Sequence, residues 1–390
     1  MFKTLSRKFT SAILIVALSL LSLVACGSST DTATEAADEP SVQESIAAQD
    51  EVTYSGPDVT TIGISMPAVQ LERWLTDGAL LKQMFEDAGY NVLITYGDNL
   101  IDTQINEINQ MIDEGAQLLI ICPVDSDSLS PCIEKAHEKN IPIVAYDRLI
   151  YHDPNLLAYV SYDNYMVGAL QADYIVDSLD LDNPDNKDTY NLEIFSGDSA
   201  DNNALYFYDG AMDILNPYIQ SGKLNVLSGQ TSFYSCSISS WSTELASERM
   251  EIMLASYYSG ADNLDAVLCS NDSIALGVCD AIDASYKKAN TVVITGQDCD
   301  TNNLENIRSG KQSMSIYKDL NHEVLATYYV VNMFLNGVSN GEDLSQNNEF
   351  DFDIKRNTSS YVSDNVAINS YLLTPTVVTI DNIDEVLNKD

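Results

Sequence analysis

Charged, amide and indole side chains recur just beyond the carboxyl ends of successive expected strands. Each of these strands is a short apolar run, and charged, amide or indole residues come shortly after it in the sequence. In the first half they are Arg73, Trp74, Asp147 and Arg148, and in the second half Asn202, Asn203, Trp241, Asn271, Asp298 and Lys318. The chain has only two tryptophans, and both are in this set. These groups favour a ligand that offers many hydrogen bonds and an apolar face.

A sugar has these properties. Each hydroxyl group both donates and accepts, so a carboxylate can take its proton while Arg, Lys or Asn donates to its oxygen. The C–H bonds on the face of a pyranose pack on an indole ring. Asp and Asn also cap helices and shape turns, and Trp often packs in a core, so each residue alone has an ordinary structural interpretation. Their joint placement at strand ends favours a sugar site.

The elements that must position these side chains alternate between strand and helix. We expect strands at 60–66, 91–96, 118–122, 143–146, 159–161, 191–195, 224–227, 266–269, 292–295 and 313–317. We expect helices at 71–88, 102–114, 129–139, 165–179, 203–219, 243–258 and 273–286. This alternation is typical of parallel sheets covered on both faces. The pattern restarts near residue 165, which predicts two α/β lobes, each a doubly wound parallel sheet, with ligand at the strand ends.

Several short motifs resemble one family. They are Leu71-Glu72-Arg73-Trp74, Ala145-Tyr146-Asp147-Arg148, Ser161-Tyr162-Asp163-Asn164, Asp201-Asn202-Asn203-Ala204, Ser270-Asn271-Asp272 and Gly296-Gln297-Asp298. In this order they resemble the D-xylose-binding and multiple-sugar-binding proteins of bacterial ABC transporters, and more distantly the ribose- and galactose-binding proteins. The resemblance extends from Thr61 to Tyr317.

The resemblance implies a type I periplasmic binding protein fold with a three-segment hinge. We expect crossings at 161–164, at 316–318 and near 371–375. The N-terminal lobe is then 59–163 plus 319–370, and the C-terminal lobe 164–318 plus 371–390. The resemblance also implies sugar-binding roles for Arg73, Trp74, Asp147, Arg148, Asn202, Asn203, Trp241, Asn271, Asp298 and Lys318, with no cofactor. Residues 229–240 depart from the family pattern before Trp241, and 336–348 form an Asn/Asp/Ser-rich insertion.

The N-terminus has the pattern of a lipoprotein signal. Lys3, Arg7 and Lys8 precede an apolar run at 11–24, and Cys26 follows Leu-Val-Ala. This site resembles the lipobox, which implies a signal peptide at 1–25 and a lipid anchor on Cys26. A plain secretion signal is the alternative. Residues 26–58 are rich in Ser, Thr, Ala and acids, which predicts a disordered acidic tether. We therefore expect an extracytoplasmic protein anchored to the bacterial cell membrane.

Charge, histidine content and cysteine spacing exclude several classes of protein. The net charge of −39 repels nucleic acid and anionic lipid. The three histidines form no His-Glu-x-x-His pattern, so we expect no metal site. Besides Cys26, six cysteines lie mostly in apolar segments, which favours buried free thiols over disulfides.

The leading interpretation is a lipoprotein that captures D-xylose or a related aldopyranose, such as glucose or galactose, and delivers it to an ABC permease. The alternative is a sugar-sensing protein that presents its ligand to a membrane chemoreceptor or histidine kinase. A glycosidase would need a carboxylate pair such as Asp147 and Asp298. Interleaved Arg and Lys argue instead for ionised hydrogen-bond acceptors, so we expect no enzyme.

Overall fold

The structure is a computed structural model that describes residues 60–69, 71–337, 344 and 350–387. The expected signal peptide, the lipidation site Cys26, the tether 26–58 and most of the insertion 336–348 lie outside the described residues. No helix in the described part is long and apolar enough to cross a membrane.

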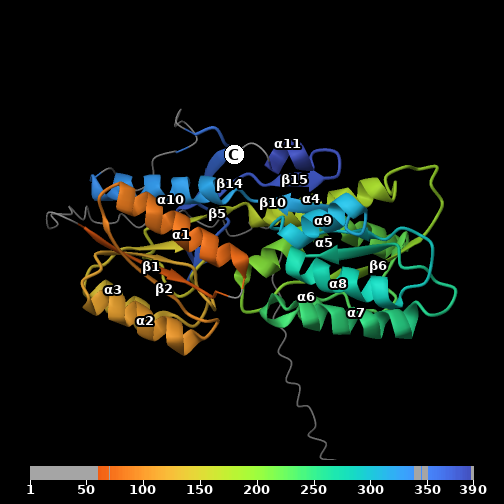
Figure 1. Ribbon diagram of the computed structural model, residues 1–390, viewed down its shortest axis with the longest axis horizontal. Helices are drawn as coiled ribbons and strands as arrows, with labels where there is room; N and C mark the ends of the chain where they lie inside the picture. The colour runs from red at the N-terminus through yellow and green to blue at the C-terminus, as the bar shows by residue number, and fades with distance from the viewer. Residues whose placement is uncertain (1–59, 70, 338–343, 345–349, 388–390) are drawn as a thin grey trace, which may run out of the picture. The chain divides into compact units, whose positions relative to one another are not determined.

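The first sheet has seven strands in the order β11-β14-β5-β4-β3-β1-β2 (Figure 1). They are β1 (Thr61–Met66), β2 (Asn91–Tyr96), β3 (Leu118–Ile121), β4 (Ile143–Tyr146), β5 (Ala158–Tyr162), β11 (Ile354–Asn357) and β14 (Ser370–Leu373). All neighbours pair in parallel except β11, which runs antiparallel to β14. Strand β1 lies between β2 and β3, so the winding direction reverses there, where ligands bind in open α/β sheets.

Helices cover both faces of this sheet. Successive strand residues point to opposite faces. Leu118 and Ile120 therefore pack in the core with α1 (Glu72–Asp87) and α10 (Leu320–Leu335). Leu119 and Ile121 pack in the core with α2 (Ile101–Asp113) and α3 (Ser130–Glu138). An apolar run without alternation is the pattern that two-sided burial requires.

The second sheet repeats this arrangement with the strand order β7-β6-β8-β9, all parallel. The strands are β6 (Tyr190–Phe195), β7 (Leu224–Asn225), β8 (Ala266–Cys269) and β9 (Val293–Ile294). One core includes residues of α4 (Asn164–Ser178) and α5 (Asn202–Ser221), and the other residues of α7 (Thr243–Tyr257) and α8 (Asp272–Ser285). Helices α4 and α5 pack so closely that a Cβ on Gly168 would lie 1.8 Å from the Phe207 carbonyl oxygen.

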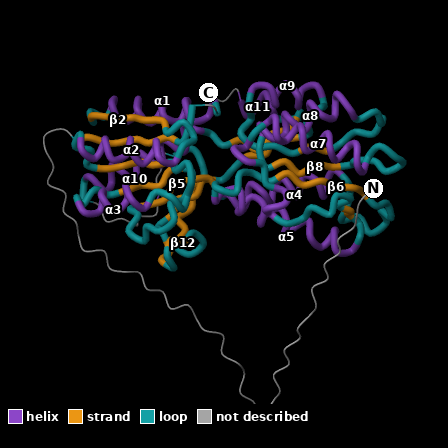
Figure 2. Tube along the Cα trace, turned by 90° about the horizontal axis from the view of Figure 1, so that it is seen from below, coloured by secondary structure: helices purple, strands orange, loops and turns teal. Residues whose placement is uncertain are grey.

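The chain passes between the two lobes three times. It leaves β5 for α4 at Asp163, and it leaves β10 (Met314–Tyr317) for α10 around Lys318. The third passage joins β14 to β15 (Thr376–Thr379), which pairs antiparallel with β10 before α11 (Ile383–Leu387). In Figure 2 the tube lies in two groups of elements, with β5 in one group and α4 in the other.

The predicted fold class is confirmed, with two wound parallel sheets in one α/β chain. The lobe boundaries stay a prediction, and the pairing of β14 with β5 adds that Ser370–Leu373 belongs to the first sheet. The sequence analysis did not predict α6 (Phe233–Cys236), the 3-10 helix at Ser239–Trp241, α9 (Thr301–Ser309), α10, β11, β12 (Val362–Ser363), β13 (Val366–Ala367) or β15. All six cysteines in the described residues are free, and five of them are buried, as expected.

Candidate functional site

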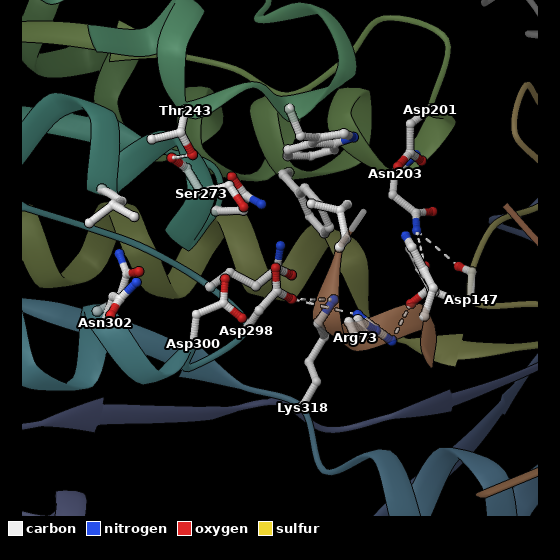
Figure 3. Close-up of a pocket in the computed structure, with 18 of the residues that line it drawn as sticks. Arg73, Asp147, Asp201, Asn203, Thr243, Ser273, Asp298, Asp300, Asn302 and Lys318 are labelled. Atoms are coloured by element: carbon white, nitrogen blue, oxygen red, sulfur yellow. Dashed lines mark hydrogen bonds and ion pairs between the residues drawn. The ribbon is translucent and has the colours of Figure 1, made fainter. Parts of the chain in front are cut away.

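A cavity of about 230 Å³ is lined by side chains that follow strands of both sheets, and Figure 3 shows these side chains around it. From the first lobe it is lined by the predicted residues Arg73, Trp74, Asp147 and Arg148. From the second lobe it is lined by Asn203, Trp241, Asn271 and Asp298, and Lys318 joins them from the crossing after β10. Nine of the ten predicted residues therefore meet at one cavity. Asn202 is the exception, because it is not among the lining residues.

Local structure explains how these side chains are presented. Arg73 lies in the first turn of α1, and Asn271 caps α8 by accepting a hydrogen bond from the Ile274 amide at 3.0 Å. Asp147 and Asp298 both have left-handed backbone conformations, with φ of 57° and 100°. Non-glycine residues seldom adopt positive φ, and backbone strain of this kind concentrates at functional sites.

Arg73 is the centre of a buried ion-pair cluster. Its Nε donates to Asp77 at 3.1 Å. Its Nη2 donates to Asp147 at 2.6 Å and to Glu323 at 2.9 Å. Asp77 and Glu323 are fully buried, and neither belonged to the predicted site. Tyr146 Oη also donates to Asp77, at 2.6 Å.

Three further ion pairs join the lobes and the crossing. Arg148 Nε lies 2.8 Å from Asp201 Oδ2, and both side chains are almost completely buried. Lys318 Nζ lies 3.2 Å from Asp298 Oδ1, and Arg73 Nη1 lies 3.6 Å from the same oxygen. The cavity wall thus alternates in charge, so it offers hydroxyl groups both donors and acceptors.

Burial and charge act in opposite directions on the pKa values of the site. Burial lowers the pKa of Arg73, but Asp147, Asp77 and Glu323 outweigh it, and the pKa rises well above its usual value. Burial raises the pKa of Asp147, but Arg73, Lys318 and Arg148 outweigh it, and the pKa falls below its usual value. Burial raises the pKa of Glu323 well above its usual value, and Asp147 adds to that rise.

Trp74 is both a core residue and a wall of the cavity. Its side chain is 4% exposed and packs in the core of the first lobe. The guanidinium carbons of Arg73 and Arg148 lie 5.0 Å and 5.1 Å from the centre of its ring. These are cation–π distances, so the indole packs beside two of the cationic side chains that line the cavity.

Asn203 and Asn202 differ in what their side chains can do. Asn203 Nδ2 donates to the Asp147 carbonyl at 2.9 Å, and Asn203 Oδ1 accepts from Tyr159 at 3.2 Å and Asn164 at 3.0 Å. Asn202 Oδ1 accepts from Ser126 Oγ across the lobes at 3.1 Å. Both residues therefore help to join the lobes, and only Asn203 also reaches the cavity.

Several lining residues were missed by the sequence analysis. Phe207 on α5 meets Trp241 edge-on, with ring centres 6.3 Å apart. Thr243, Ser273, Asp300 and Asn302 line the second-lobe side, as Figure 3 shows. Thr243 and Ser273 lie in the first turns of α7 and α8, which follow predicted strands, so their position in sequence was a usable signal. Among the described residues no group of His, Cys, Asp and Glu could hold a metal ion.

Comparisons with known proteins agree with this geometry. A family profile described as periplasmic binding protein domain matches residues 62–339. The chain is 35% identical over 333 residues to the multiple sugar-binding periplasmic receptor of Rhizobium radiobacter. The aligned region spans 85% of this chain and 90% of that relative. The chain is 30% identical over 329 residues to the D-xylose-binding periplasmic protein of Escherichia coli K12, which spans 84% and 89%.

A solved structure has the same fold at higher identity. It is an ABC transporter solute binding protein from Clostridium phytofermentans with bound β-D-glucose. The two chains are 41% identical with a TM-score of 0.78, over 84% of this chain and 96% of the other. These relatives are described as binding proteins or receptors, in agreement with the expectation that the chain is not an enzyme.

Proposed function

Because this chain belongs to the periplasmic binding protein family, we propose that it captures a monosaccharide between its two lobes and delivers it to an ABC permease. The lobes separate to admit the ligand and close on it by hinge motion at the three crossings. Contacts to both lobes then stabilise the closed form, which is the form that a permease recognises.

One observation carries this proposal. A single cavity is lined by acidic, basic and amide side chains from both lobes together with Trp74, Phe207 and Trp241. A sugar needs both kinds of group, because its hydroxyls must be paired once they leave water and its C–H faces favour aromatic rings. The ten sugar-binding residues named from the sequence stay a proposal, with Asn202 acting through the lobe interface rather than at the cavity.

The proposed ligand is D-xylose or an aldohexopyranose such as glucose or galactose. Support comes from relatives, since one is named for D-xylose, one for multiple sugars, and one solved structure contains β-D-glucose. Xylose differs from glucose only at C5, where it lacks the hydroxymethyl group.

A thermal-shift and calorimetric screen tests the function. The protein from residue 59 onward should bind one equivalent of a monosaccharide, and its melting temperature should rise, as for any ligand selective for the folded state. The panel is xylose, glucose, galactose, arabinose and ribose, with mannitol as an open-chain control. A protein that responds to none of the five sugars at millimolar concentration would not have the proposed function.

Sugar sensing is the second candidate, because one relative is named a receptor. In that role the loaded lobes would dock on a membrane chemoreceptor or histidine kinase. Deleting the gene separates the two roles: loss of sugar uptake supports transport, while intact uptake with a lost transcriptional or chemotactic response supports sensing.

We further propose that the protein works outside the cytoplasm, held by a lipid anchor on Cys26. The sequence around Cys26 is the support, and the acidic tether would keep the lobes clear of the membrane. Metabolic labelling with a clickable palmitate analogue should mark the wild-type protein but not Cys26→Ala. Release of Cys26→Ala into the medium, with sugar binding retained, would complete the test.

A further inference from the structure

The five N–H donors of Arg73 are divided unevenly among its neighbours. A guanidinium group has one donor on Nε and two on each Nη. Nε binds Asp77, and the two donors of Nη2 bind Asp147 and Glu323. Three donors are therefore used by three carboxylates that lie on α1, on the loop after β4 and on α10. Three anchors on separate elements prevent the guanidinium from rotating.

The two remaining donors lie on Nη1. Nη1 lies 3.6 Å from Asp298 Oδ1, an ion-pair distance, and Asp298 lines the cavity. The guanidinium carbon of Arg73 lies over the indole of Trp74, 5.0 Å from the ring centre. A ligand can therefore reach Arg73 at the Nη1 edge, where two N–H bonds point in fixed directions.

We propose that Asp77 and Glu323 are positioning residues that set the specificity of the site by holding the Nη1 edge of Arg73 toward the ligand. Neither carboxylate lines the cavity, and both are completely buried. These carboxylates accept hydrogen bonds from Nε and Nη2, which leaves the two N–H groups of Nη1 for the ligand. A ligand that binds both must offer two neighbouring acceptor oxygens. Two adjacent oxygens of a sugar are such a pair of acceptors. The inference on specificity therefore rests on the proposed function.

Glu323 gives the sharper test because, among the described residues, its carboxylate has one hydrogen-bonding partner, Arg73 at Oε2, while the buried Oε1 has none. Glu323→Gln keeps a carbonyl oxygen that can accept from Nη2, whereas Glu323→Leu keeps the size and removes the acceptor. We expect Glu323→Leu to weaken sugar binding roughly tenfold or more, and Glu323→Gln to restore most of that loss. Glu193→Leu is the matched control, because Glu193 is a fully buried glutamate that binds Ser228 and Tyr258 outside the cavity.

A double-mutant cycle separates positioning from general stability. In an Arg73→Met background, Glu323→Leu should cause no further loss of affinity, since there is no guanidinium left to orient. The control Glu193→Leu should lower the melting temperature in both backgrounds and leave the dissociation constant unchanged. Equal loss of affinity from Glu323→Leu with and without Arg73 would overturn the proposal.

A measurement without sugar keeps the inference independent of the function. In ligand-free protein labelled with ¹⁵N-arginine, NMR should show slow rotation about the Nε–Cζ bond of Arg73 compared with Arg308, which is exposed and pairs only with surface carboxylates among the described residues. Glu323→Leu should speed that rotation. Rotation as fast as that of Arg308 in the wild type would overturn the positioning role. If rotation is slow and no sugar binds, the positioning role holds and only the proposed function fails.

Discussion

The indole of Trp241 fills the space that a side chain at Gly197 would need. An ideal Cβ on Gly197 would lie 2.0 Å from Cη2 of Trp241, far inside van der Waals contact. Gly197 follows β6 in the second lobe, and Trp241 ends the short 3-10 helix before α7. Because Gly197 has no side chain, the indole of Trp241 can occupy this space and form an aromatic wall of the cavity.

Gly197→Ala should therefore displace the indole. We expect weaker sugar binding and a loss of about 1–3 kcal/mol in the free energy of unfolding, which is typical of overpacking. Gly260→Ala is the control, because a Cβ there meets no atom within 4 Å. Calorimetry and thermal melts of both variants make the comparison. Unchanged affinity in Gly197→Ala would mean that the position of Trp241 does not matter for binding.

Trp74→Ala should damage both stability and binding. Because the indole is buried in the core, its removal should cost about 3–5 kcal/mol of unfolding free energy. Arg73 and Arg148 would also lose the ring that lies beside them, so the remaining folded protein should bind sugar more weakly. In a Trp241→Phe background, sugar should change the fluorescence of Trp74. Unchanged fluorescence in that background, with sugar binding intact, would mean that Trp74 does not contact the sugar.

Asp298→Ala should weaken sugar binding by about 2–4 kcal/mol, because a charged acceptor is lost and Lys318 is left without its partner. The fold should survive, since the Asp298 side chain is 17% exposed and lies at the cavity. Titration calorimetry against the wild type measures the effect. Wild-type affinity would show that Asp298 serves only to shape its loop.

Arg148→Ala should lower the free energy of unfolding more than the double change of Arg148→Ala with Asp201→Asn. The single change leaves the Asp201 carboxylate buried without its cation, which typically costs about 3–5 kcal/mol. Converting Asp201 to the neutral amide removes that penalty, so stability should recover although sugar affinity stays low. Urea unfolding of both variants tests this order, and equal stability would argue against the ion pair.

Glu323→Gln should change how stability depends on pH. Burial raises the pKa of Glu323 above its value in the unfolded chain. Its favourable contribution is therefore complete below the unfolded pKa and is lost as the pH rises through the folded pKa. Since Gln does not titrate, the melting temperature of Glu323→Gln relative to the wild type should increase as the pH is raised from the usual pKa of a glutamate toward the raised pKa of Glu323. A constant difference would mean that Glu323 keeps one charge state over this range.

The sequence by itself determined most strands of the two sheets and nine of the residues that line the cavity. The run Leu118–Ile121 has no polar residue, so it had to be a strand buried on both faces. Once strands and helices alternate, the carboxyl ends of parallel strands share one edge of a sheet. Asp147 after β4 and Asp298 after β9 were therefore placed at the cavity from their position along the chain.

Only the tertiary structure decided which distant residues hold these side chains in place, and which of two adjacent residues lines the cavity. Glu323 lies 250 positions from Arg73, and α10 returns to the first lobe only through the second crossing. Asn202 and Asn203 are adjacent on α5, yet only Asn203 lines the cavity. Successive residues of a helix point about 100° apart, and pairs far apart in sequence meet only after packing, so neither relationship is contained in local periodicity.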